Sequence, residues 1–277
     1  KKIKNNFMKE KIKKVIIIGA AGRDFHNFLT YFKDKPEYRV VCFTAAQIPG
    51  IEKRKYPASL AGKLYPKGIP IYPEKELGKL VKKFKIDEVV FSYSDVSYQY
   101  LMNLASLAMA NGASLRLLGP RQTMISSKKK VIAVCATRTG AGKSMVSKTI
   151  LNILKEKGYS VSVIRHPMPY DPNLKSQEVQ KFSSYDDLKT YNATIEEREE
   201  YEPYIEAGGS IFAGVDYKKI LKRAEKEGDI ILWDGGNNDF PFIKPNFYIT
   251  VADPHRVNDE INYWPSAINL ILSDLII

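Results

Sequence analysis

Residues 131–154, VIAVCATRTGAGKSMVSKTILNIL, contain a strand pattern, a glycine-containing loop and a helix pattern in direct succession. Residues 131–136 are all apolar, as in a strand that is buried on both faces of a parallel sheet. From Lys143 onward apolar residues recur at helical spacing, and Gly158 marks the end of the helix. A buried strand, Gly-x-Gly-Lys-Ser and a helix form the context of a phosphate-binding loop. The stretch therefore predicts an α/β domain of the P-loop NTPase kind, with helices on both faces of a parallel sheet.

The loop has the residue types that phosphate binding requires. Gly140 and Gly142 can adopt backbone conformations that a Cβ atom disfavours, which lets successive N–H groups converge on an anion. Lys143 would reach the outer phosphates, and the Ser144 hydroxyl would bind Mg²⁺. Thr137 stands where the usual pattern has glycine, and we interpret it as a variant of the loop. The residues expected to bind ATP or GTP are Thr139, Gly140, Ala141, Gly142, Lys143, Ser144 and Met145.

An acidic residue at the end of another strand complements the loop. Asp234 follows the apolar run IILW and precedes two glycines, so Ser144 and Asp234 are the expected metal ligands. Arg138 stands at a loop position where some members of the P-loop class that contains dethiobiotin synthetase carry a second lysine. It would neutralise charge in the transition state, or else face solvent. The expected catalytic residues are Lys143, Arg138, Asp234 and His166.

Further polar residues follow neighbouring strands. Arg165 and His166 end one strand pattern, and the segment ADPHR follows another. Because ligands of open α/β sheets bind beyond the carboxyl ends of the strands, these residues are candidates for a second, anionic substrate or for proton transfer. Ordinary polar loop residues are the alternative. The candidate substrate residues are Arg165, His166, Asn237, Asn238, Asp253, His255, Arg256, Gly19, Gly22 and Arg23.

The first half of the chain also alternates strand and helix patterns, which predicts a Rossmann-like parallel sheet. Gly19 and Gly22 follow its first strand, as in half of a dinucleotide fingerprint. The third glycine position holds Phe25, and the next strand does not end in an acidic residue, so we expect no NAD. A nucleotide-like or anionic ligand, or tight strand–helix packing, are the open alternatives.

These patterns divide the chain into two domains. Residues 1–13 are expected to be a flexible basic arm, 14–120 the Rossmann-like domain, 121–130 a linker and 131–277 the NTPase domain. The last domain carries an insert at about 168–210. Its acidic segment IEEREEYEPYIE is expected to be a solvated helix face or a lid over the site.

Composition limits the partners. Net charge is +12, but the lysines are scattered rather than arranged on one helix with aromatic residues, so nucleic acid is not an expected partner. No apolar run approaches the length of a membrane helix. Cys42 and Cys135 lie in apolar strand patterns and read as buried hydrophobic residues. We expect a cytoplasmic protein that binds a nucleotide and a small anionic substrate. The resemblance to the P-loop class that contains dethiobiotin synthetase, in which dimers are common, implies a homodimer.

Longer segments carry a resemblance to a known family. GAAGRDFHNF, VVFSYSDVSYQY, CATRTGAGKS, VIRHPMPY, WDGGNNDFPFIKP and VADPHR are similar to segments of a prokaryotic family of predicted GTPases, also labelled cyclic 2,3-diphosphoglycerate synthetase-like. In that family an Asn-Lys-x-Asp segment, which would read guanine, follows the strand that corresponds to SDLII. The sequence stops at Ile277, so relative to this family we expect the C-terminal part to be incomplete.

The residues and the resemblance together predict a Mg-dependent P-loop enzyme. It would use ATP or GTP for phosphoryl transfer or ligase-type chemistry on a small anionic substrate, and the resemblance implies cyclisation of 2,3-diphosphoglycerate. A regulatory or chaperone-like GTPase is the first alternative, and a nucleic-acid-binding NTPase is the second.

Overall fold

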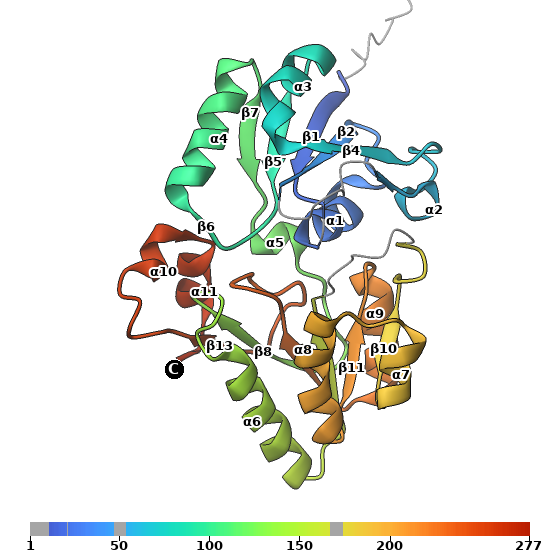
Figure 1. Cartoon of the computed structure of the whole chain (residues 1–277), viewed down its shortest axis with the longest axis vertical. Coiled ribbons are helices and arrows are strands. Elements are labelled where there is room, and N and C mark those ends of the chain that lie inside the picture. Colours follow the sequence, from blue (N-terminus) through green and yellow to red (C-terminus); the bar gives the residue numbers. More distant parts are fainter. Residues whose placement is uncertain (1–10, 21, 47–53, 167–173) are drawn as a thin grey trace, which may run out of the picture.

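The computed structural model describes residues 11–20, 22–46, 54–166 and 174–277. Residues 1–10 of the expected arm and 168–173 of the expected insert lie outside these ranges. The described chain forms two α/β lobes, drawn one above the other in Figure 1, each built around its own sheet. Within the described ranges, no helix is both long and apolar enough to cross a bilayer.

The first sheet has the strand order β3-β4-β2-β1-β5-β7. Its inner strands are parallel, whereas the edge strand β3 runs antiparallel to β4. The elements of this lobe are β1 (Lys13–Ile18), α1 (Arg23–Asn27), η1 (Phe28–Phe32), β2 (Tyr38–Ala45), β3 (Lys55–Tyr56), α2 (Ala58–Ala61), β4 (Ile69–Pro73), η3 (Glu74–Glu76), α3 (Leu77–Phe84), β5 (Glu88–Phe91), β6 (Val96–Ser97), α4 (Tyr98–Ala110), β7 (Ser114–Leu117) and α5 (Pro120–Thr123).

The second sheet has the order β10-β11-β9-β12-β8-β13-β15, and here the edge strand β10 is the antiparallel one. The elements of this lobe are β8 (Lys130–Ala136), α6 (Lys143–Glu156), β9 (Val161–Arg165), β10 (Gln180–Phe182), α7 (Tyr185–Thr190), α8 (Ile195–Glu206), β11 (Ser210–Ala213), α9 (Tyr217–Glu227), β12 (Ile230–Asp234), β13 (Phe247–Val251), α10 (Asp259–Asn262), β14 (Tyr263–Trp264), α11 (Ser266–Leu272) and β15 (Leu275–Ile276).

Helices cover both faces of each sheet, as the apolar strand patterns predict. In the first lobe, α1, α2 and η1 pack on one face, while α3 and α4 pack on the other. In the second lobe, α9 covers one face, and α6, α7 and α8 cover the other. The chain is therefore an α/β protein. Its sheets are mixed rather than wholly parallel, since short antiparallel strands close one edge of each.

Capping residues define the helices that frame the functional region. Ser97 accepts a hydrogen bond from the Tyr100 N–H at the start of α4, and Asp216 accepts two at the start of α9. Thr194 and Glu197 form a reciprocal capping box at the start of α8. The acidic segment is thus a defined helix, which packs against α6 and β11.

The two lobes are joined by a polar and aromatic interface. Arg23 of α1 is buried, donates to the Asp239 carboxylate at 2.7 Å, and lies 3.8 Å from the centre of the Phe240 ring. The His26 imidazole stacks on Phe242 at 4.2 Å. Strands β6 and β14, one from each lobe, pair antiparallel. These contacts place the carboxyl ends of both sheets at the same junction.

Within the expected linker, 121–130, the described structure is ordered against the second lobe. Helix α5 ends at Thr123, and Ile125 forms a parallel bridge with Ile243.

Candidate functional site

The loop between β8 and α6 has the backbone of an anion-binding turn. Gly140 and Gly142 have φ values of +85° and +98°, a region that residues with a Cβ atom rarely adopt. The Gly142 carbonyl accepts from the N–H groups of Met145 and Val146, so the helix begins directly behind the loop. Because the first N–H groups of a helix lack intrahelical partners, this end of α6 favours an anion.

Thr137 is held through hydrogen bonds to its own backbone N–H and carbonyl rather than through its side chain. Its N–H donates to the Val251 carbonyl at 2.9 Å, and its own carbonyl accepts from Asn238 at 3.2 Å and from the Ser266 hydroxyl. Asn238 is fully buried and also donates to Ser266 at 2.8 Å. The candidate substrate residue Asn238 therefore braces the loop from behind.

Asp234 is the centre of a buried charge cluster. Its carboxylate accepts from Lys143 Nζ, from the Arg165 guanidinium and from the Tyr204 hydroxyl. Burial alone would raise the pKa of Asp234, but Arg165, Lys143 and the hydrogen bonds outweigh burial and lower it to about 2. Arg165 also pairs with Glu200 of α8 at 2.7 Å. Lys143 and Arg165 therefore share the ionised Asp234 beside the loop, and Glu200 provides Arg165 with a second carboxylate.

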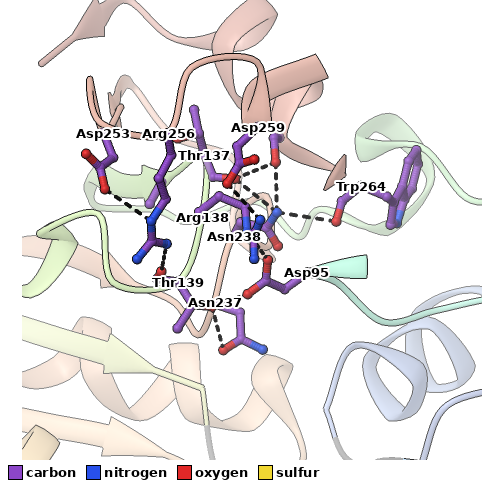
Figure 2. A network of polar contacts seen from close by, with 12 residues as sticks. Asp95, Thr137, Arg138, Thr139, Asn237, Asn238, Asp253, Arg256, Asp259 and Trp264 are labelled. Atoms are coloured by element: carbon purple, nitrogen blue, oxygen red, sulfur yellow. Dashed lines mark hydrogen bonds and ion pairs between the residues drawn. The ribbon is translucent and has the colours of Figure 1, made fainter. Parts of the chain in front are cut away.

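Arg138 turns toward the first lobe (Figure 2). Its Nε donates to Asp95 at 2.6 Å, and its Nη1 donates to Asp259 at 2.8 Å. The guanidinium lies 3.5 Å from the centre of the Tyr263 ring. Asp95 also accepts from the Thr139 hydroxyl, so it binds the loop at two points. Arg138 therefore occupies an ion-pair network between the lobes instead of facing solvent, and it also lines the pocket over the loop.

Arg256 supports the loop from the opposite side (Figure 2). Its Nη1 donates to the Thr139 carbonyl at 2.7 Å, and its Nε pairs with Asp253 at 3.3 Å. His255 is exposed, and its backbone N–H donates to Asp253. The ADPHR segment therefore reaches the loop through Arg256.

A pocket of about 310 Å³ opens over the loop. It is bounded by the loop, the start of α6 and the charge cluster. Its lining residues are Arg138, Thr139, Gly140, Gly142, Lys143, Ser144, Met145, Arg165, Glu200 and Asn237. A neighbouring pocket of about 340 Å³ shares Ser144 and Glu200 with it and is otherwise formed by Lys148, Glu196, Glu199, Pro203 and Tyr204. The acidic helix α8 thus forms a wall of the site.

Two of the candidate substrate residues from the first lobe pack in the interface instead of lining this pocket. A Cβ atom on Gly22 would lie 1.7 Å from Cε1 of His166, and the Arg23 guanidinium is enclosed by Asp239 and the Phe240 ring. Gly19, at φ +114°, packs against Asp24 of its own lobe. His166 Nε2 lies 3.8 Å from the Asp239 carboxylate. The contact of Gly19 with Asp24 of α1 is tight strand–helix packing, whereas Gly22 packs across the lobe interface against His166.

Several residues of this site do not follow from the sequence pattern. Tyr204 and Glu200 come from a helix whose acidic residues surround it, so no apolar stripe indicated which side faces the loop. Asp95 follows the strand pattern of β5, and its position beyond a strand end was the available signal. Asp259 and Tyr263 carry no such signal.

Among the groups that could hold a metal, the described residues include no cluster of three or more His, Cys, Asp or Glu side chains. Ser144 and Asp234 are both at the loop: Ser144 lines the pocket, and Asp234 lies beneath it.

Comparison with known proteins gives one strong match. No protein-family model matches the chain. The chain is 58% identical over 268 residues, or 97% of its length, to a protein of Thermococcus kodakarensis named arginine synthetase ArcE. It spans 60% of the length of that protein. Among solved structures, a DUF1611 family protein from Anabaena variabilis aligns over 87% of this chain and 73% of its own, with 11% identity and a TM-score of 0.26, too low to support any conclusion.

The match corrects the expected family and reaction. The resemblance to predicted GTPases and cyclic 2,3-diphosphoglycerate synthetases is wrong, because the 58% identical relative carries a different name and activity. Cyclisation of 2,3-diphosphoglycerate is therefore set aside, together with the GTPase switch and the nucleic-acid-binding NTPase. The physical reason is that a phosphate loop announces only the phosphate group. It recurs in enzymes with unrelated second substrates and so does not identify the reaction.

Proposed function

We propose that the chain is the nucleotide-dependent part of a synthetase that forms arginine. The observation that carries this proposal is the placement of Lys143, Arg165 and Asp234 around a glycine loop, in a chain 58% identical to a protein named arginine synthetase. The chain spans 60% of the length of that relative, so the synthetase activity of the whole protein is part of what we propose.

The loop fits a nucleoside triphosphate with Mg²⁺. The two positive-φ glycines leave room and donors for phosphate oxygens at the start of α6, and the exposed Ser144 hydroxyl faces the same pocket. Asp234 lies where a carboxylate would hold the metal's water molecules. Both ATP and GTP satisfy this chemistry, because both carry the triphosphate that the glycine loop would bind.

Lys143 would have two alternative partners, the Asp234 carboxylate and the phosphate chain of a bound nucleotide. In the structure Asp234 accepts from both Lys143 and Arg165. A phosphate chain in the loop would draw Lys143 away from Asp234, and Arg165 would remain to neutralise the carboxylate. The rearrangement keeps every buried charge paired, which low-dielectric surroundings demand. Lys143 then neutralises phosphate charge, and Arg138 would do so if it left Asp95.

Arginine formation has a chemical need that such a site meets. Forming the last carbon–nitrogen bond of a guanidinium group from a neutral urea-type precursor and ammonia requires the carbonyl oxygen to leave. Phosphorylation of that oxygen would release a nucleoside diphosphate, and ammonia would then displace the oxygen as phosphate. A bound nucleoside triphosphate supplies the phosphoryl group that achieves this. The chain's own residues hold the phosphates and position them, and positioning is a large part of the acceleration in such reactions.

The proposal is tested in the direction that consumes arginine, because a catalyst accelerates both directions of a reaction. The full-length protein is incubated with arginine, phosphate and ADP or GDP, and newly formed nucleoside triphosphate is measured. We expect triphosphate that depends on arginine and on Mg²⁺. Lys143→Ala should lower the rate by about 100-fold or more. Lys157→Ala, at the far end of the same helix, should leave it unchanged.

Two results would overturn the proposal. If arginine causes no nucleoside triphosphate to form with either ADP or GDP, the protein does not have the proposed synthetase activity. A Lys143→Ala variant as active as the parent protein would remove the loop from the reaction.

A further inference from the structure

A second pocket lies at the carboxyl edge of the first sheet. It has a volume of about 320 Å³ and opens toward solvent. Ala46 follows β2 and Tyr93 follows β5, the two strands that flank β1 in the parallel part of the sheet, so the carboxyl ends of both strands meet this pocket. Its lining residues are Ala46, Tyr93, Val96, Ser97, Tyr100 and Tyr263. This is the position at which open α/β sheets bind ligands.

A buried carboxylate stands behind two of these tyrosines. Glu74, which begins the turn after β4, is only 6% exposed. Its carboxylate accepts from the Tyr93 hydroxyl at 3.1 Å and from the Tyr100 hydroxyl. No Lys, Arg or His of the described ranges forms an ion pair with it. A buried carboxylate that has no cation beside it is costly in free energy, so this arrangement favours a positively charged ligand.

The Tyr93 and Tyr100 hydroxyls lie between the Glu74 carboxylate and the pocket, and their pKa values respond to its negative charge. Burial first, and then the charge of Glu74, raises the pKa of Tyr93, and the pKa of Tyr100 is raised by burial and by its hydrogen bond to Glu74. Both hydroxyls therefore keep their protons. The Tyr100 hydroxyl donates to Glu74 and lies 3.2 Å from the Tyr93 hydroxyl, so one lone pair of its oxygen remains to accept a hydrogen bond from a ligand.

The aromatic wall suits a planar cation in particular. A guanidinium group stacks on tyrosine faces and donates in its own plane, whereas an ammonium group acts as a point charge. The same wall already holds one guanidinium, since Arg138 lies 3.5 Å from the centre of the Tyr263 ring. Tyr263 lines the second pocket, and Arg138 lines the pocket over the glycine loop. The stacked pair of Arg138 and Tyr263 therefore separates the two pockets.

We infer that this pocket binds the guanidinium end of arginine, held by the faces of Tyr93, Tyr100 and Tyr263 and by the negative charge of Glu74. The inference rests on the proposed function, which supplies arginine as the ligand. It places the guanidinium group in the first lobe, next to the phosphate loop of the second lobe, so each lobe contributes one of the two reactants.

The test is calorimetric titration of the full-length protein with L-arginine and with L-citrulline, its neutral isostere. Wild-type protein should bind arginine more tightly than citrulline. Glu74→Gln should weaken arginine by about 10- to 100-fold and change citrulline by about twofold or less, because only arginine carries the charge that Glu74 attracts. Tyr100→Phe should weaken arginine by about three- to tenfold.

Matched controls are available on the same elements. Glu76→Gln lies in the same helical turn as Glu74, and Tyr98→Phe lies two residues before Tyr100 in the first turn of α4; neither residue lines the pocket. Both should bind arginine as the parent protein does. Thermal unfolding of all variants shows whether a loss of binding reflects a loss of folded protein.

The outcomes separate this inference from the proposed function. Arginine bound equally by wild-type and Glu74→Gln protein overturns the pocket, even if arginine-dependent triphosphate is formed. Binding that depends on Glu74 without any triphosphate supports the pocket and overturns the function. A wild-type protein that binds no arginine overturns the pocket directly.

Discussion

The carboxyl edges of the two sheets share an architecture and differ in charge. At the second sheet, the glycine loop carries Arg138 and Lys143 and lies beside Arg165, and each of these cations is paired with a carboxylate from elsewhere in the chain. At the first sheet, the corresponding edge carries a buried Glu74 under tyrosine hydroxyls. The strands behind both edges are apolar, mainly parallel and covered by helices. The difference teaches that the residues after each strand, rather than the sheets, decide which ligand charge an edge accepts.

The largest effect is expected where positive charge is concentrated. In Asp234→Asn protein, Lys143 and Arg165 lose the carboxylate that neutralises them, and we expect a loss of about 3–5 kcal/mol in the free energy of unfolding. Urea denaturation measures it. Asp229→Asn, at the exposed start of the same strand, is the control and should have little effect. Equal losses in both variants would contradict a buried charge centre at the second edge.

The next effect concerns the polar and aromatic interface between the lobes, called the seam below, which holds the carboxyl edges of the two sheets face to face. An alanine at Gly22 would place its Cβ atom 1.7 Å from the His166 ring, so Gly22→Ala must separate the lobes or displace that ring. We expect a loss of about 1–3 kcal/mol in stability. Gly119→Ala is the matched control, because nothing lies within 4 Å of its Cβ position. If Gly22→Ala unfolds at the same urea concentration as the control, the seam is looser than the contacts imply.

Acid should weaken the same seam. Burial, and secondarily Arg23, lowers the pKa of His26 to about 3, whereas an unfolded histidine has a pKa of about 6.5. Between these values only the unfolded chain binds the proton, so stability is complete above about pH 6.5 and falls on acidification. From pH 7 to pH 5 the loss should be about 2 kcal/mol.

His26→Gln provides the control for this pH dependence. Glutamine keeps a donor for the Thr123 carbonyl, which His26 Nε2 meets at 2.7 Å, and it does not titrate. The pH dependence of its unfolding free energy should be flatter than that of the parent protein by the amount given above. Parallel profiles for the two proteins would mean that His26 does not carry the effect.

The smallest effect is expected at the link between the edges. Asp95 of the first lobe holds Arg138 and Thr139 of the loop. Asp95→Asn should release Arg138 toward the phosphates and tighten binding of ATP or GTP by about two- to fivefold, less at high salt. Fluorescent nucleotide titration measures this change, with the exposed Asp186→Asn as control. Weaker nucleotide binding would show that Asp95 orders the loop instead of restraining it.

The sequence was sufficient for the parts of the site that depend on local pattern. The glycine loop, the strand before it and the helix after it are set within 131–154, and Asp234 was located by the end of an apolar run. The α/β class followed from the alternation of strand and helix patterns. What it could not supply was the reaction, because a glycine loop of this kind predicts at most a phosphate group and leaves the second substrate open.

Contacts between distant segments were beyond reach. Arg138 was expected at phosphate or in solvent, yet its partners Asp95 and Asp259 lie 43 and 121 residues away. Asn238 was a candidate for substrate, whereas it braces the loop through Thr137 and Ser266. The pocket over Glu74 cannot be predicted from the sequence, because Glu74 and Tyr100 lie 26 residues apart and no short motif joins them.

The pairing of β6 with β14 has an optical consequence. The chain contains two tryptophans. Trp233 is fully buried against Phe242, whereas Trp264 of β14 is half-buried beside Tyr98 and adjoins the tyrosine pocket through Tyr263. Their emission should therefore differ in colour, the first blue and the second redder. The protein carries an internal standard in one lobe and a reporter at the junction, and the ratio of the two intensities can be followed without any added dye.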